Sequence, residues 1–199
     1  MLKHMNSTTE PQLAAPGKGL PYIHYLVARY YALPKFWRAS TWESALQLHE
    51  RQGQKILALA KPLSDEQMQK RVLVHGIRGI EDSSRFWSVG MAIEHLIIVG
   101  NEMLDGMVLL SQGKVPNKVA SIAAVKPKGE HADRSIIAAY EVFLNKYRDV
   151  LASGLQNRDS KTRFRHPWFG LMTAFQWHCL AAVHTHLHRK QIEAILKGT

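Results

Sequence analysis

The segment TAFQWHCLAAVHTHLHRKQIEAILK, residues 173–197, decides the fold of this chain. Its first four residues, Thr173 to Gln176, form a capping box, which predicts one long helix that runs to about Lys197. One face of this helix carries, at helical spacing, Trp177, Ala181, His184, His188 and Ile195. A core helix would normally place leucine or isoleucine at the two histidine positions. The pattern therefore predicts a buried helix with a polar site on its inner face.

His184 and His188 are four residues apart, so they project from one side of the helix and can share one metal ion. A buried imidazole needs a partner, and a metal is one such partner. The spacing alone is a weak signal, because 11 histidines in 199 residues give roughly 0.6 such pairs by chance. A structural or exposed pair therefore stays an alternative. A zinc-like catalytic site also needs a third protein ligand.

His95 is the candidate for that third ligand. It lies within a second predicted helix, which starts after Ser88 as N-cap and continues to about Leu110. Its neighbours on the apolar stripe are Ala92 and Val99, so His95 should point into the core. One metal would satisfy all three imidazoles, whereas a hydrogen-bonded core histidine is the alternative for each of them alone. His186 points away from the pair and is expected to be exposed or to lie beside the site.

Two further helices complete the pattern. Residues 40–43, Ser-Thr-Trp-Glu, form a capping box before a helix that ends near Lys61-Pro62, and another helix runs from near Asp133 to Gly154. Residues 113–132 are long enough to cross between two helices. No segment alternates with period two, so a sheet of any size is not expected. The sequence predicts an all-α four-helix bundle with one long crossover connection.

The N-terminus stands apart from the bundle. Residues 1–19 are polar and rich in proline and glycine, and are expected to form a disordered tail. Residues 20–39 are aromatic and apolar and should pack on the bundle, with contact to a membrane surface as the alternative. This run is too short and too interrupted to predict a transmembrane segment. The bundle domain is expected to span residues 40–199.

Composition narrows the class of protein. A single cysteine, Cys179, excludes a disulfide framework and a cysteine zinc site, and indicates a cytoplasmic protein. The formal net charge is +10, but the basic residues are dispersed, and no helix-turn-helix or aromatic-basic platform predicts specific binding to nucleic acid. The densest basic stretch is expected to be a loop that holds Arg158, Lys161, Arg163 and Arg165. A monomer and a homodimer are both left open.

Three stretches resemble the DinB/YfiT-like family of metal-binding helical bundles. They are Phe86-Trp87-Ser88-Val89 leading to Glu94-His95-Leu96, His166-Pro167-Trp168-Phe169-Gly170, and His184-x-x-x-His188-Arg189-x-Gln191-Ile192. The resemblance covers about residues 40–197. It implies a four-helix bundle in which His95, His184 and His188 hold a divalent metal. Three histidines suit zinc, nickel, cobalt, iron and copper, and zinc and nickel are the leading candidates.

Members of that family with known activity are often thiol-dependent transferases or isomerases that use glutathione-like, mycothiol or bacillithiol cofactors. The resemblance therefore implies a metal-dependent transferase or hydrolase that acts on a small molecule, with a low-molecular-weight thiol as a second cofactor. A non-catalytic metal- or ligand-binding bundle is the alternative. No residue is assigned as catalytic, because the nearest carboxylates, Glu94 and Glu102, have ordinary structural explanations.

Two expectations concern the surroundings of the metal. Trp168, Phe169 and Trp177 should line a pocket at its open coordination position, where aromatic walls would exclude water. Arg163 or Arg165 is expected to bind the cofactor, because a guanidinium can pair with the carboxylate of a glutathione-like thiol.

Overall fold

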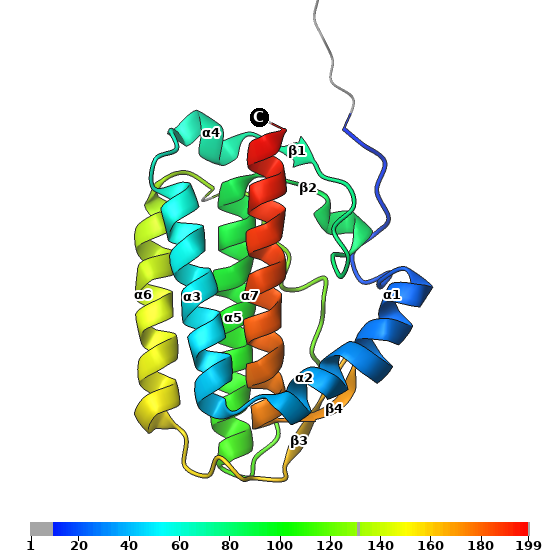
Figure 1. Ribbon diagram of the computed structural model, residues 1–199, viewed down its shortest axis with the longest axis vertical. Coiled ribbons are helices and arrows are strands. Elements are labelled where there is room, and N and C mark those ends of the chain that lie inside the picture. The colour runs from blue at the N-terminus through cyan, green and yellow to red at the C-terminus, as the bar shows by residue number, and fades with distance from the viewer. Residues whose placement is uncertain (1–9, 131, 199) are drawn as a thin grey trace, which may run out of the picture.

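Four long helices stand side by side in the computed structural model, which describes residues 10–130 and 132–198 (Figure 1). They are α3 (Trp42–Ala60), α5 (Val89–Ser111), α6 (Ser135–Asp149) and α7 (Ala174–Lys197). Helix α7 packs on α3 and α5, and α6 packs on the same two helices from the other side. The predicted all-α four-helix bundle is therefore confirmed.

The connection between α5 and α6 crosses the length of the bundle. Helices α3 and α7 run in one direction, and α5 and α6 run in the other (Figure 1). Helix α6 consequently begins beside the end of α3, where the backbone N–H of Arg134 donates to Asp65 and its guanidinium donates to the carbonyl of Lys61. Residues 112–134 form the return, so the predicted long crossover is confirmed.

Hydroxyl caps set where the helices begin. Ser88 is the N-cap of α5, as predicted. The capping box of α3 lies one residue later than predicted: Thr41 is the N-cap in place of Ser40, and Ser44 takes the role expected of Glu43. The reason is that a serine hydroxyl at the third helical position can accept the N–H of the cap as well as a carboxylate can.

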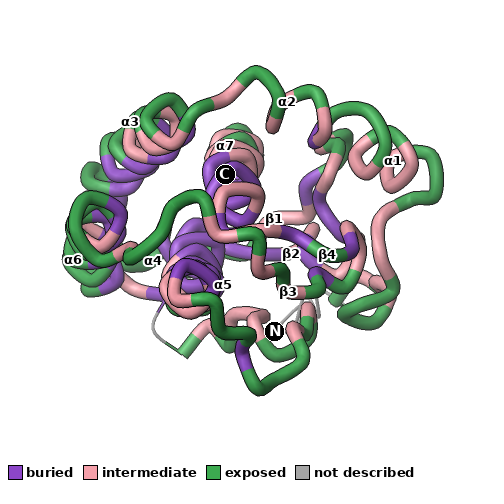
Figure 2. Tube along the Cα trace, turned by 90° about the horizontal axis from the view of Figure 1, so that it is seen from below, coloured by how far each residue is buried: buried purple, intermediate pink, exposed green. Residues whose placement is uncertain are grey.

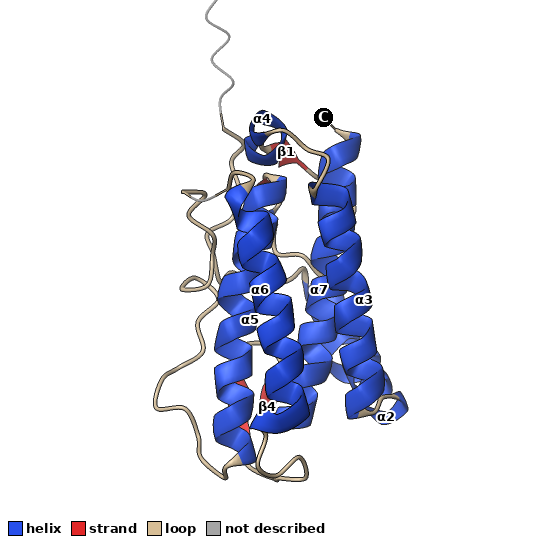
Figure 3. Cartoon of the chain, turned by 90° about the vertical axis from the view of Figure 1, so that its left-hand side faces the viewer, coloured by secondary structure: helices blue, strands red, loops and turns tan. Residues whose placement is uncertain are grey.

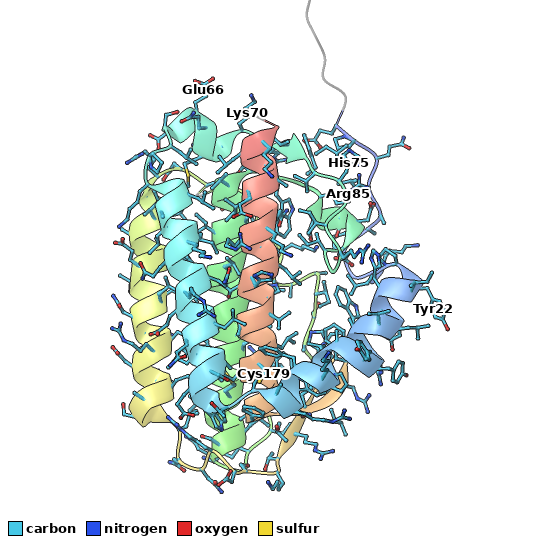
Figure 4. All side chains as sticks on the ribbon, viewed as in Figure 1. Tyr22, Glu66, Lys70, His75, Arg85 and Cys179 are labelled. Atoms are coloured by element: carbon cyan, nitrogen blue, oxygen red, sulfur yellow. The ribbon has the colours of Figure 1, made fainter. Side chains whose placement is uncertain are left out.

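A helical strap precedes the bundle. It consists of α1 (Tyr22–Val27), a π-helical segment (Ala28–Ala32) and α2 (Leu33–Ala39). Helix α2 contacts α7, and Tyr22 lies at the outer tip of α1 (Figure 4). The first nine residues of the expected tail lie outside the described residues, and within residues 10–19 the backbone of Ala14 donates to Asp82. The proposed domain boundaries stay a prediction.

The remaining elements are short (Figure 3). They are α4 (Asp65–Gln69), β1 (Val72–Leu73), a 3-10 turn (Asp82–Ser84), β2 (Phe86–Trp87), a π-helical segment (Val150–Gly154), β3 (Arg163–His166) and β4 (Gly170–Thr173). Strands β1 and β2 pair antiparallel, as do β3 and β4. Each pair is an isolated two-stranded ribbon, which agrees with the expectation that no large sheet forms.

Strand β3 corrects one prediction. Arg163 and Arg165 were expected in a loop, but they lie on this strand and pair with Thr173 and Leu171. The reversal between the strands uses Gly170 at φ +82°, a conformation that glycine adopts at little cost. Four residues of alternation are too few to be recognised in a sequence.

The core lies between the four long helices, whose inward sides are buried (Figure 2). Large apolar side chains such as Ile56, Leu104 and Ile192 are completely covered. Their burial stabilises the bundle by about 1.5–3 kcal/mol per side chain. No helix in the described part of the chain combines the length and apolar character that a membrane span needs.

Candidate metal centre

Two neighbouring helices bring three histidines together in the core. His95 lies on α5, and His184 and His188 lie one turn apart on α7. The Thr173–Gln176 capping box begins α7 as predicted and sets the register of the two histidines on that helix. Because α5 and α7 pack on each other, the inner faces of both helices meet at these side chains.

The imidazole nitrogens converge to within contact distance. His184 Nε2 lies 3.1 Å from His95 Nε2 and 3.0 Å from His188 Nε2. His95 and His188 are buried, whereas His184 is partly exposed. The predicted separation of about 3–4 Å, which ligands at ~2.1 Å from a common centre require, agrees with this arrangement.

Hydrogen bonds on the far side of two rings determine which nitrogen is protonated. His95 Nδ1 lies 2.7 Å from the carbonyl oxygen of Val125, and His188 Nδ1 lies 2.7 Å from Gln191 Oε1. The Gln191 amide is itself oriented, because its Nε2 donates to the Ser84 carbonyl. Both oxygens only accept, so each Nδ1 must donate. The Nε2 lone pairs of His95 and His188 therefore point at the shared centre.

Burial keeps these imidazoles neutral. Desolvation lowers the pKa of His188 to about 4, and it holds the pKa values of His95 and His184 well below the ordinary 6.5. Mutual repulsion between the charged forms lowers the pKa values of His95 and His184 further. Trp87 stacks on His188 with ring planes 11° apart and shields one side of the cluster. Neutral imidazoles are the form that binds metal ions.

The donor set fits a cation better than it fits hydrogen bonds alone. If His184 carries its proton on Nε2, that proton can satisfy His95 or His188, but not both. If the proton is on Nδ1, three lone pairs face one another without a donor. A buried acceptor without a partner costs about 1–3 kcal/mol. A divalent ion would satisfy all three nitrogens at once, and these three histidines are the residues that would hold it.

Comparison with known proteins supports the fold and the family. A model of the DinB superfamily matches residues 47–192, which is most of the chain. The chain belongs to the DinB superfamily. It is also similar in structure to a chain described as "Crystal structure of TT2238, a four-helix bundle protein", with a TM-score of 0.50 and 21% identity over 77% of this chain and 99% of that one. No curated protein matches the sequence significantly.

His95, His184 and His188, together called the triad below, form part of the wall of a cavity of about 620 Å³. Trp168 and Phe169 line this cavity as predicted, whereas Trp177 lines a neighbouring cavity of about 220 Å³. The strap supplies much of the opposite wall. The partly exposed His184 therefore adjoins a space large enough for a small molecule.

The two candidate cofactor-binding arginines lie elsewhere on β3. Arg163 and Arg165 are exposed, whereas Phe164 and His166 alternate with them and turn toward the cavities. Neither arginine is part of the cavity wall beside the triad. Their role in cofactor binding stays a prediction, and no contact to the triad supports it.

The nearby carboxylates have structural partners. Glu94 accepts hydrogen bonds from the backbone of Lys128 and Gly129 and so anchors the crossover. Glu102 forms an ion pair with Lys118. His186, as expected, lies outside the cluster, and its Nδ1 is 3.3 Å from Gln52.

Cys179 is a core residue. It is buried with Ala45 and Ala182, near the lower end of α7 in Figure 4. Burial raises the pKa of its thiol to about 12, although a hydrogen bond with Ser40 acts in the opposite direction. The thiolate that a nucleophile requires is therefore strongly disfavoured.

Sequence reasoning missed the groups that orient the ligands. Gln191 lies three residues after His188, on the same side of α7, and this spacing was the one available signal for it. The carbonyl of Val125 gives no sequence signal. The next residue, Lys126, forms a 2.7 Å ion pair with the buried Glu81, and this pair helps to hold the crossover beside His95.

Proposed function

We propose that this protein is a divalent-metal-dependent enzyme with His95, His184 and His188 as the metal ligands. The observation that carries the proposal is that His184 Nε2 lies 3.1 Å from His95 Nε2 and 3.0 Å from His188 Nε2. Val125 and Gln191 direct the lone pairs of His95 and His188 inward. Three neutral nitrogens suit zinc or nickel, which are the proposed metals.

When bound, such an ion would supply Lewis acidity that lowers the pKa of a thiol or water nucleophile. The protein would contribute preoriented ligands and a cavity from which bulk water is excluded. His95 and His188 are held in fixed tautomers, so little reorganisation accompanies ligation. Trp168 and Phe169 would exclude bulk water and hold an apolar part of the substrate. The proposed reaction class is thiol-dependent transfer or hydrolysis of a small molecule, with a low-molecular-weight thiol as co-substrate.

A second function, metal or ligand binding without catalysis, is favoured by one observation. Glu81 is the only carboxylate among the described residues that line the cavity. It accepts hydrogen bonds from the backbone of Gly17 and Gly19 and from Ser83, and it pairs with Lys126. Burial would raise the pKa of Glu81, but these hydrogen bonds, chiefly that from Lys126, outweigh burial and lower it. Such a carboxylate is a poor general base.

Metal analysis is the first test. Protein purified without a metal-affinity step should contain about one zinc or nickel ion per chain by elemental analysis. His184→Ala should lose that metal. The matched control is His186→Ala, which removes a histidine two positions away that lies outside the cluster. Equal metal content in both variants would refute the assignment of the ligands.

Turnover separates the two functions. Wild-type protein and His184→Ala are assayed with glutathione, mycothiol and bacillithiol against a panel of electrophiles. Metal-dependent turnover that His184→Ala abolishes would support the enzyme. Bound metal without turnover would support the binding bundle.

A further inference from the structure

The strap makes the cavity mostly apolar on the side opposite the triad. The strap and the residue pair before it contribute the apolar side chains of Leu20, Ile23, Val27, Ala28, Ala32 and Leu33, and one polar side chain, that of His24. All of them precede residue 47, where the match to the DinB superfamily begins. This wall is therefore an addition of this chain to the matched bundle, and whatever it contacts is selected by residues of the strap.

The wall is attached at two places. The Arg29 guanidinium donates to the carbonyl of Trp168, which ties the strap to the turn between β3 and β4. The backbone N–H groups of Gly17 and Gly19 donate to Glu81 Oε1 at 2.7 and 3.1 Å. Tied at Arg29 in its middle and through Gly17 and Gly19 just before its first helix, the strap holds the cavity in a preformed shape, which is the usual state of a small-molecule site.

One buried polar group in the cavity wall has an unused donor. His166 is 6% exposed, and its Nδ1 accepts the backbone N–H groups of Trp168 and Phe169 at 3.1 and 3.3 Å. Nδ1 is therefore the unprotonated nitrogen, and the proton is on Nε2, on the other side of the ring. No described residue accepts a hydrogen bond from that Nε2. Nε2 is not among the fully buried atoms that lack a partner, so it is accessible from the cavity and can donate to an oxygen of a ligand.

The cavity wall also contains an exposed cation. Arg78 belongs to the residues that line the cavity, and no carboxylate among the described residues pairs with it. The other cation of the wall, Lys126, is occupied by Glu81, Ser83 and Ser84. A free guanidinium beside an apolar cavity matches a ligand that carries a carboxylate.

We propose that the cavity binds an organic acid with an apolar body: the body packs against the strap, the carboxylate is recognised by Arg78, and the Nε2–H of His166 donates to an oxygen of the ligand. The proposal names the substrate class of the proposed function and rests on it only for the chemistry that follows binding. Binding itself requires no metal. A volume of about 620 Å³ suits an acid of the size of an aromatic ring system with a short side chain.

The test is isothermal titration calorimetry on protein stripped of metal by a chelator. The probes are naphthylacetate and naphthylacetamide, which have the same apolar body and differ in charge. Naphthylacetate should bind about tenfold more tightly than the amide, and this preference should shrink at high salt. Arg78→Ala should remove the preference, whereas Arg38→Ala, at an exposed position away from the cavity, should keep it.

A second pair of variants tests the strap wall. Ala28→Trp places a large ring in the cavity and should weaken binding of both probes by about tenfold or more. Its control, Ala39→Trp, puts the same ring at an exposed strap position outside the cavity. His166→Phe keeps the stack on Phe169 but removes the donor, so it should weaken both probes. Circular dichroism checks that each variant is folded. If Ala28→Trp does not fold, the Arg78→Ala variant still tests the proposal, because Arg78 is exposed and its replacement should not disturb the fold.

The outcomes separate the two proposals. Equal affinity for the two probes in wild-type protein, or unchanged binding in a folded Ala28→Trp variant, would overturn the organic-acid site. Binding as expected in a protein that purifies without metal would leave the site standing and refute the metalloenzyme. Metal-dependent turnover without any binding of the acid probe would support the metalloenzyme and refute the organic-acid site.

Discussion

Replacing His49 with phenylalanine should increase the free energy of unfolding more at acidic pH than near neutral pH. His49 is 2% exposed, stacks on Tyr147 at a centroid distance of 4.0 Å, and its Nδ1 has no partner. Burial, with a smaller contribution from His178, lowers its pKa from 6.5 to about 3. The residue therefore stays neutral in the folded protein at pH values where the unfolded chain takes up a proton.

The sign and the size follow from that difference. Because the folded-state pKa is depressed, the wild-type protein loses stability as the pH falls below 6.5 toward 3. Each pH unit corresponds to about 1.4 kcal/mol, so lowering the pH from 6.5 to about 5 costs the wild type roughly 2 kcal/mol through His49. Phenylalanine removes this loss. At about pH 7.5 the substitution should change the free energy of unfolding little. Removing the unpartnered nitrogen should stabilise the fold by about 1–3 kcal/mol, and overpacking by the larger ring should destabilise it by a similar amount.

The assay is urea unfolding of wild type and His49→Phe at about pH 7.5 and about pH 5, both with chelator. Packing strain does not depend on pH, so the diagnostic quantity is the change in the difference between the two proteins, which should be roughly 2 kcal/mol. Tyr140→Phe is the control, because it removes another buried unpartnered polar atom that does not titrate in this range. A His49→Phe effect that is the same at both pH values would refute the reasoning.

Three further predictions concern the site and the core. Gln191→Leu should lower metal affinity about 10- to 100-fold by freeing His188 Nδ1, as measured by competition with a chromophoric chelator. Gly90→Ala should lower the melting temperature strongly, because the added Cβ would lie 2.0 Å from a backbone oxygen of the crossover. The control is Gly106→Ala on the same helix, whose Cβ meets nothing within 4 Å and which should stabilise the fold by about 0.5–1 kcal/mol. The buried Cys179 should react with a disulfide reagent only after unfolding, and rapid reaction of the native protein would contradict its assignment to the core.

The sequence by itself determined the helices and the faces they bury. Caps such as Ser88 and Thr173 are local signals, because the hydroxyl bonds a backbone N–H only a few residues away. The spacing of His184 and His188 is equally local, since four residues are about one helical turn. The apolar stripe around His95 also predicted that its side chain would point into the bundle, where the structure has it.

Only the tertiary structure decided what surrounds those side chains. The carbonyl of Val125 orients His95 from 30 residues away, and the strap closes the cavity from outside the bundle. Strand pairing turns Arg165 outward and His166 inward, which four residues of sequence do not reveal. These contacts join segments distant in the chain, so they depend on how the helices pack, and no local pattern of residues encodes them.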